Sequence, residues 1–240
     1  MSEKVDILAI GAHPDDIELG CGGTLIKEIE TGKKVGLIDL TQGELGTRGN
    51  KEIREKEAEF SKNEMGAVFR DNLFLDDCFF ENNRDNQIQL ISKIRRYKPE
   101  IIICNAPDDR HIDHQKAAKL VVDASFLSGL KKIETSFEGK LQDIWRPVNV
   151  YHYIQWKNLE PDFLVDISDY LNKKLILINC YKSQFFNPKK SNDNTPISSK
   201  NFLDSITYRA RDLGRLVGVE AAEGFIASRH PLVNSITELK

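Results

Sequence analysis

The sequence predicts an α/β fold of Rossmann-like type, in which helices cover both faces of a mostly parallel sheet. In the first half of the chain, short apolar runs rich in β-branched residues alternate with segments of helical periodicity. This alternation is typical of βαβ units around a buried parallel sheet. The length of 240 residues suits one domain of this class, so we expect a single domain over residues 1–240.

Four strands and four helices are expected to alternate in the first half. The predicted strands are Val5–Ile10, Val35–Leu40, Asn72–Leu75 and Glu100–Cys104. The predicted helices are Gly23–Thr31, Lys51–Met65, Asn86–Tyr97 and Ile112–Leu127. Asn50 is the expected N-cap of the second helix, and helix stop signals follow three of the helices, at Gly32, Gly66 and Pro99.

The second half of the chain is less regular. Strands are expected at Val148–Ile154 and Phe163–Ile167, and Ser168 is the expected cap of a helix that runs to about Phe185. The segment Asn187–Lys200 is polar and has no apolar period, which indicates a surface loop. The last long helix is predicted at Asn201–Leu216.

Composition narrows the range of partners. Lys and Arg number 34 against 37 Asp and Glu, a formal charge of −3, so there is no overall basic field for nucleic acid or an anionic membrane. No apolar run approaches the roughly 18 residues of a membrane span, and the first residues lack the pattern of a signal peptide. Four scattered cysteines without a Cys-x-x-Cys pair are typical of reduced thiols, so we expect a cytoplasmic protein.

The densest polar clusters follow the first and fourth predicted strands. In an open parallel sheet, ligands bind beyond the C-terminal strand ends, at the point where the strand order reverses. For the common order 3-2-1-4-5, this point lies between strands 1 and 4. The two clusters are His13-Pro14-Asp15-Asp16 and Asp108-Asp109-Arg110-His111-Ile112-Asp113-His114, and they hold three of the five histidines. The sequence therefore predicts an active site at the C-terminal ends of these two strands.

These residue types favour a metal site. Imidazoles and carboxylates bind Zn²⁺ or Fe²⁺, and two His with one carboxylate leave a coordination position for water. His13 and Asp16 are three residues apart, so one turn can aim both at one point, and His114 completes the set from the other loop. We expect Zn²⁺ at His13, Asp16 and His114, with Fe²⁺ as the alternative.

The neighbouring residues suggest hydrolysis of an amide. Asp15 is the expected general base, and a protonated His111 would stabilise the oxyanion. Asp113 could hold the imidazole of His111. The composition alone does not separate amide hydrolysis from ester hydrolysis.

Each cluster also has a simpler interpretation. His13-Pro14-Asp15-Asp16 alone could be an ordinary turn, and His111 with His114 could be a helix N-terminus. Their joint placement at one switch point favours the metal site over both interpretations and over a non-catalytic interaction module.

The glycines of Gly20-Cys21-Gly22-Gly23 raise a rival of another class, a nucleotide-binding oxidoreductase. The sixth position of the nicotinamide fingerprint is Leu25, and the acidic residues before the glycines would repel a pyrophosphate. We expect these glycines to permit close approach of helix and sheet. Cys21 and His152 are expected to be packing residues.

The quoted motifs resemble those of a known enzyme family. Residues 12–25, AHPDDIELGCGGTL, together with His111-Ile112-Asp113-His114, resemble the zinc-dependent N-acetylglucosamine deacetylases of the LmbE-like (PIG-L) family. Further stretches resemble its branch of bacillithiol biosynthesis deacetylases of the first type, among them residues 43–49, GELGTRG, and Ser183-Gln184-Phe185.

The resemblance implies a cytoplasmic hydrolase that removes acetate from N-acetylglucosaminyl malate. It also implies residue roles that agree with those suggested above. His13, Asp16 and His114 would bind zinc, and Asp15 would be the general base. His111 with Asp113 would assist the oxyanion and the leaving group. It also implies a Rossmann-like fold and a homo-oligomer, a hexamer in close relatives. A deacetylase of the chitin-derived disaccharide and an amidase of thiol conjugates remain alternatives.

Three arginines are candidates for binding the malate carboxylates. The family pattern places Arg54 at the rim of the active site, although its spacing alone suggests a solvated helix residue. Arg48 and Arg110 lie in the loops after the second and fourth predicted strands. Arginine pairs with a carboxylate through two hydrogen bonds, so we expect all three to contact substrate.

Overall fold

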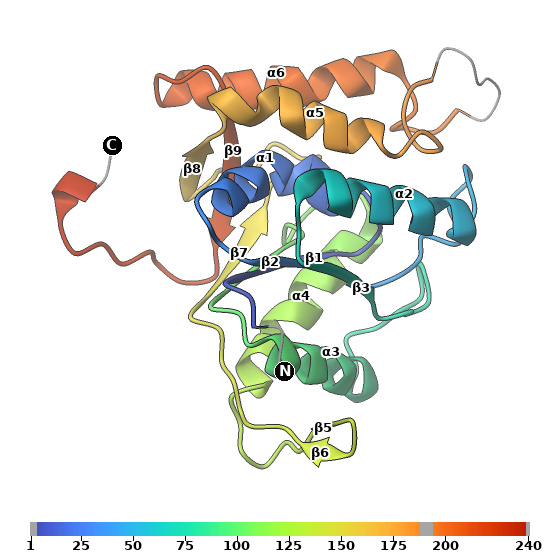
Figure 1. The fold of residues 1–240 in the computed structure, drawn as a ribbon. Coiled ribbons are helices and arrows are strands. Elements are labelled where there is room, and N and C mark those ends of the chain that lie inside the picture. The colour runs from blue at the N-terminus through green and yellow to red at the C-terminus, as the bar shows by residue number, and fades with distance from the viewer. Residues whose placement is uncertain (1–3, 188–193, 239–240) are drawn as a thin grey trace.

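A seven-stranded sheet with the order β3-β2-β1-β4-β7-β9-β8 lies at the centre of the computed structural model, which describes residues 4–187 and 194–238 (Figure 1). Five neighbouring strands are parallel: β3 (Phe69–Asn72), β2 (Val35–Asp39), β1 (Ile7–Gly11), β4 (Ile101–Cys104) and β7 (Asn149–Tyr153). The last two, β9 (Ala222–Ala227) and β8 (Phe163–Asp166), are antiparallel to their neighbours. The predicted mostly parallel sheet, with β1 beside β4, is confirmed.

Helices cover both faces of this sheet. One layer contains α1 (Asp16–Glu30), α2 (Lys51–Met65), α5 (Leu171–Asn179) and α6 (Lys200–Leu216), and the other contains α3 (Arg84–Tyr97) and α4 (Ile112–Leu127) (Figure 1). The short pieces are the hairpin β5 (Ser136–Phe137) and β6 (Lys140–Leu141) and the 3₁₀ turns η1 (Ser168–Tyr170) and η2 (Ile236–Glu238). Within the described residues, no helix is long and apolar enough to cross a membrane.

Alternation along β1 divides the core into two halves. Leu8 and Ile10 pack with the side chains of α3 and α4, whereas Ile7 and Ala9 pack with those of α1. All four side chains are buried, as expected for a strand that is covered on both faces. The burial of β1 fixes the position of the loop that follows it, which carries the first of the two polar clusters.

The third strand lies earlier than predicted. It spans Phe69–Asn72, whereas the apolar run at residues 72–75 suggested a strand there. Leu73 and Leu75 are buried because they enter the core beyond the strand end. The strand itself carries Arg70, which forms ion pairs with Glu18 and Asp39.

Two further predictions differ from the structure, and one strand was not predicted. α1 begins at Asp16 rather than Gly23, and its backbone is non-helical at Cys21 (φ −142°). The helix predicted to reach Phe185 ends at Asn179, and β9 was not predicted. Within the predicted loop 187–200, residues 188–193 lie outside the described residues, and residues 194–199 form no helix or strand before α6 begins at Lys200.

The break in α1 has a clear structural partner. The carboxylate of Glu223 on β9 accepts hydrogen bonds from the backbone N–H groups of Gly23 (3.0 Å) and Thr24 (2.7 Å). Lys174 on α5 forms an ion pair with the same carboxylate at 2.6 Å, and both side chains are buried. Backbone groups freed by the break are thereby satisfied.

Candidate active site

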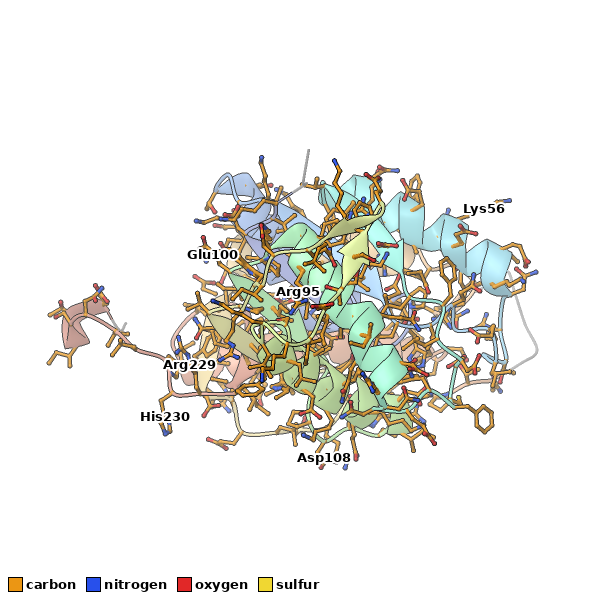
Figure 2. The ribbon with its side chains drawn as sticks, turned by 90° about the horizontal axis from the view of Figure 1, so that it is seen from below. Lys56, Arg95, Glu100, Asp108, Arg229 and His230 are labelled. Carbon is orange, nitrogen blue, oxygen red and sulfur yellow. The ribbon has the colours of Figure 1, made fainter. Side chains whose placement is uncertain are left out.

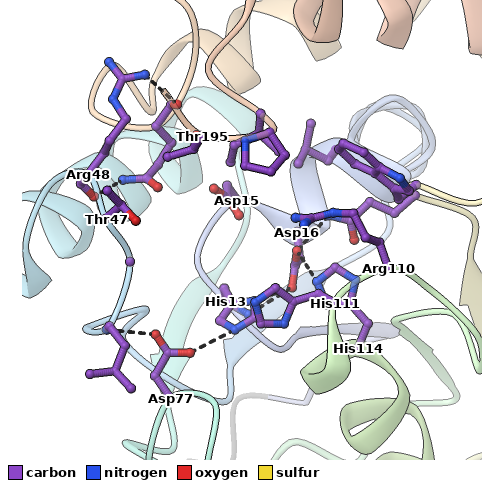
Figure 3. Close-up of a pocket in the computed structure, with 18 of the residues that line it drawn as sticks. His13, Asp15, Asp16, Thr47, Arg48, Asp77, Arg110, His111, His114 and Thr195 are labelled. Carbon is purple, nitrogen blue, oxygen red and sulfur yellow. Dashed lines mark hydrogen bonds and ion pairs between the residues drawn. The ribbon is translucent and has the colours of Figure 1, made fainter. Parts of the chain in front are cut away.

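A cavity of about 260 Å³ lies where the loops after β1 and β4 meet (Figure 3). All residues proposed from the sequence line it except Asp113. The parallel pairing of β1 with β4 aligns Ile10 with Cys104, so the two loops leave the sheet side by side. This register brings together side chains that are about 100 residues apart in the sequence.

Asp16 lies between the two histidines of the expected metal set. Its Oδ2 is 3.4 Å from Nδ1 of His13, and its Oδ1 is 3.2 Å from Nε2 of His114. The carboxylate also accepts hydrogen bonds from the side-chain amides of Asn105 (3.1 Å) and Gln155 (2.7 Å). Asp16 is therefore held in one orientation between two imidazoles.

The far nitrogens of both imidazoles contact further carboxylates. Nε2 of His13 is 3.1 Å from Asp77 and 3.2 Å from Asp113, and Nδ1 of His114 is 2.8 Å from Asp109. Ionised carboxylates only accept hydrogen bonds, so these nitrogens carry protons. The other nitrogens, Nδ1 of His13 and Nε2 of His114, face Asp16 and would offer their lone pairs to a metal ion that displaces their protons.

This donor set fits a divalent metal ion. Metal-bound histidines usually donate their other N–H to a carboxylate, which fixes the ring and raises its basicity. One ligand atom of each of His13, His111 and His114 lies within 4.8 Å of the others, and Asp16 contacts two of these three rings. His13, Asp16 and His114 could hold the ion, with His111 beside it.

The pKa values show a strongly negative field at these rings. Burial lowers the pKa of His13, but hydrogen bonds to Asp113, Asp16 and Asp77 raise it well above its usual value. Burial also lowers the pKa of His114, but Asp16 and Asp109 raise it to about 9. The field that favours a proton on these rings also favours a bound cation.

Asp15 precedes α1 in a left-handed backbone conformation (φ 112°). Such a conformation is strained for a residue other than glycine and is often retained at functional sites. The side chain lines the cavity but is buried. Burial raises the pKa of Asp15 to about 7, and the guanidinium of Arg54 opposes this rise. A carboxylate that titrates near neutrality can both accept and return a proton.

His111 differs from the sequence-based expectation in two ways. Burial and the positive charges of His13 and His114 lower its pKa, so the ring is neutral near pH 7 rather than protonated. Its Nδ1 accepts the backbone N–H of Asp113 at 3.3 Å, which places the proton on Nε2. The carboxylate of Asp113 does not hold His111 as expected, because it contacts His13, the backbone N–H of Cys78 and Lys116 instead.

The three arginines occupy different environments. Arg54 is only 5% exposed and is not the solvated residue that its spacing suggested. It donates to the carbonyls of Pro14 and Gly43, and its Nη2 is 3.4 Å from Oδ2 of Asp15. Arg54 therefore braces the loop that carries Asp15.

Arg48 and Arg110 lie nearer the mouth of the cavity. Nη1 of Arg48 donates to the backbone carbonyls of Gln184 and Phe185. The guanidinium of Arg110 lies 4.6 Å from the ring centroid of Trp156. Arg110 has the exposed position that recognition of an anionic substrate group needs.

Several residues of the site were missed from the sequence. Asp77 follows β3 and Gln155 follows β7, so neither belongs to the two loops at the switch point. Asp109 and Asn105 lie in or next to the second cluster, but no role was assigned to them. The only available signal was their position after the C-terminal ends of parallel strands.

His152 and two of the glycines have structural roles, and His230 lies away from the cavity lining. A Cβ atom on Gly20 would lie 2.1 Å from the ring of Tyr153, and one on Gly23 would lie 2.9 Å from Ile167, so the predicted close packing of helix and sheet is confirmed. His152 is buried and bonds to the carbonyl of Asn105. His230 is exposed at the base of the C-terminal segment (Figure 2).

The sequence of this chain is similar to those of known deacetylases. Residues 8–125 match the PIG-L family, described as GlcNAc-PI de-N-acetylase. The chain is 28% identical to diacetylchitobiose deacetylase of Thermococcus kodakarensis over 191 residues, which cover 75% of this chain and 70% of that protein.

Two solved structures extend the similarity over the whole fold. A conserved protein from Thermus thermophilus, TT1542, is 32% identical, with a TM-score of 0.85, and the match covers 97% of this chain and 98% of that one. The N,N'-diacetylchitobiose deacetylase from Pyrococcus horikoshii has a TM-score of 0.77 at 23% identity, and the match covers 97% of this chain and 88% of that chain. At 23% identity, the similarity to the Pyrococcus horikoshii enzyme establishes the fold alone.

Proposed function

The chain belongs to the LmbE-like (PIG-L) deacetylase family, and we propose that it is a metal-dependent hydrolase that removes acetate from N-acetylglucosaminyl malate. The observation that supports the metal chemistry most strongly is the orientation of two imidazoles. Carboxylates hold the far nitrogen of each ring, so the nitrogens that a metal would bind, Nδ1 of His13 and Nε2 of His114, both face Asp16.

His13, Asp16 and His114 would hold a divalent metal, which would supply a water of lowered pKa and a Lewis acid for the acetyl carbonyl. Asp15 accepts a proton from the attacking water, and its pKa of about 7 suits that role. Arg54 holds the carboxylate at 3.4 Å and fixes the carbonyl of Pro14 in the same loop.

The oxyanion and the leaving group need separate donors. His111 is neutral, and its Nε2–H can donate to the oxyanion without carrying a full charge. Asp15 can then return its proton to the leaving nitrogen, so one carboxylate serves first as base and then as acid. No other titratable side chain with a pKa raised to about 7 lines the cavity within the described residues.

The proposed aglycone accounts for the cations at the mouth. Malate adds two carboxylates to the sugar, and arginine pairs with carboxylates through charge-assisted hydrogen bonds. Arg110 is the better placed of the two outer arginines, because Arg48 already donates to backbone carbonyls. Zn²⁺ is the proposed metal, and Fe²⁺ suits the same ligands.

A second candidate is the deacetylation of diacetylchitobiose. It is favoured by the 28% identity to an enzyme of that name. The two substrates share the acetamido sugar and differ in the group attached to it. The discriminating experiment incubates the metal-loaded protein with each substrate and measures the free amine. We expect a higher kcat/KM for the malate conjugate. A preference for the disaccharide would favour the second candidate, and free amine from neither would contradict both.

A further inference from the structure

Three buried polar atoms without a hydrogen-bond partner belong to residues that line the active-site cavity. They are Nε of Arg54, Oε1 of Gln155 and Oγ1 of Thr195. The other unpaired atoms in the described residues belong to Glu18, Thr24 and Ser125, which lie outside the lining of the cavity. Buried polar atoms in native proteins are nearly always paired, so unpaired atoms that gather at one cavity indicate groups that a ligand completes.

The orientation of Gln155 is fixed by its neighbour. Its Nε2 donates to Oδ1 of Asp16 at 2.7 Å. The same carboxylate accepts the backbone N–H of His13 at 3.0 Å and Nδ2 of Asn105 at 3.1 Å on its Oδ2. A carboxylate surrounded by donors presents only an acceptor to Gln155, so the amide cannot be turned around. Oε1 is therefore the unpaired end, and it is an acceptor.

A second side-chain amide on the same carboxylate provides a comparison. Asn105 donates from Nδ2 to Oδ2 of Asp16 at 3.1 Å, and its Oδ1 accepts the backbone N–H of Ala12 at 2.9 Å. Both ends of Asn105 are thus paired within the protein. Gln155 also donates to Asp16, but its Oε1 has no partner. Support of Asp16 therefore does not explain why the acceptor of Gln155 is left free.

The segment around Gln155 is held in place. Gln155 follows the last residues of β7, and the next residue, Trp156, lies between two partners. The ring of Trp156 stacks on Phe202 with centroids 5.3 Å apart, and Arg110 lies 4.6 Å from its centroid. Oε1 of Gln155 is therefore a preorganised acceptor next to Asp16.

We propose that Oε1 of Gln155 accepts a hydrogen bond from the N–H of the scissile acetamido group and so selects amides over esters. This inference rests on the proposed function. A secondary amide carries an N–H beside the reacting carbonyl, whereas an ester carries an oxygen that cannot donate. A site built to bond a substrate donor discriminates against an analogue that lacks it, because its own polar group is then left unpaired.

The test compares two sugars that carry acetate at the same position, methyl 2-acetamido-2-deoxyglucoside and methyl 2-O-acetylglucoside. Acetate release is measured with the wild type, Gln155→Met and Gln155→Lys, and bound metal is measured for each protein. Lysine keeps a donor for Asp16 but offers no acceptor. We expect the ratio of amide to ester kcat/KM to fall roughly tenfold in both variants.

Asn105→Leu is the matched control, because it also removes an amide from Asp16 but no free acceptor. Its losses should be equal on the two sugars and should follow its metal content. Equal losses on both sugars in the Gln155 variants, or a ratio restored by lysine, would overturn the role of Gln155. Wild-type release of acetate from the ester alone would overturn the proposed function as well.

Discussion

Arg54 and Asp15 form a buried ion pair in which Nη2 of the guanidinium lies 3.4 Å from Oδ2 of the carboxylate. The two residues come from different segments, since Asp15 precedes α1 and Arg54 lies in the first turns of α2. The positive charge lowers the pKa of Asp15, which burial raises to about 7. The pair therefore sets the pH at which the proposed base becomes active.

Replacement of Arg54 by methionine should move the pH profile. Without the guanidinium, the pKa of Asp15 rises further, and the base is deprotonated only at higher pH. We expect the acidic limb of kcat/KM to shift upward by about one pH unit, with Arg54→Lys shifting it less. A lower rate with an unmoved limb would indicate that Arg54 acts only through the loop carbonyls of Pro14 and Gly43.

Asp15→Asn should keep the metal and lose the reaction. The substitution removes the base but leaves His13, Asp16 and His114 unchanged. Losses of a general base are typically of order 10²–10⁴-fold, so we expect a fall of that size in kcat at full metal occupancy. Single-turnover acetate release measures it, and a rate within threefold of the wild type would move the base role to another group.

His114→Ala and Asp109→Asn should distinguish the loss of a metal ligand from the loss of the side chain that supports this ligand. The first variant should lose metal and activity together. In the second, His114 remains but loses the charged acceptor of its Nδ1–H at 2.8 Å, since Oδ1 of residue 109 already accepts the backbone N–H groups of Arg110 and Lys157. Loss of such a support typically lowers metal affinity by about 10–100-fold. Metal titration checks both, and full occupancy of His114→Ala would contradict its assignment as a ligand.

Arg110→Met should affect the malate conjugate selectively. A partly desolvated ion pair with a carboxylate contributes about 1.5–3 kcal/mol, which corresponds to roughly a ten- to hundredfold lower kcat/KM. N-acetylglucosamine lacks the carboxylates and should be hydrolysed nearly as before. Added salt should weaken the wild-type preference, since an ion pair at the mouth of the cavity is only partly desolvated and is still screened. Equal losses on both sugars would assign Arg110 a general supporting role.

The sequence predicted the part of the fold and site that depends on local pattern. The buried runs of β1 and β4 and the polar residues directly after them are contiguous in the chain, and topology brings them together. β9 escaped prediction because Glu223 and Gly224 interrupt its apolar pattern. Glu223 is buried only because Lys174 and the broken helix α1 provide its partners.

The site residues that were not predicted also depend on tertiary packing rather than on local sequence pattern. Asp77 and Gln155 follow strands away from the switch point, and only the packed structure shows that they contact His13 and Asp16. The expected partner of Asp113 is His111, two residues before it in the sequence. In the structure, the Asp113 side chain reaches His13, which lies in the other loop.

The central claim is that a metal at His13, Asp16 and His114 supports removal of acetate from an amide. The most direct measurement strips the protein with a chelator and returns Zn²⁺ in small steps while acetate release from N-acetylglucosaminyl malate is followed. We predict no release from the stripped protein and a rate that rises linearly to a break at one equivalent of metal per chain. An unchanged rate after stripping, or no acetate from the reloaded protein, would contradict the account.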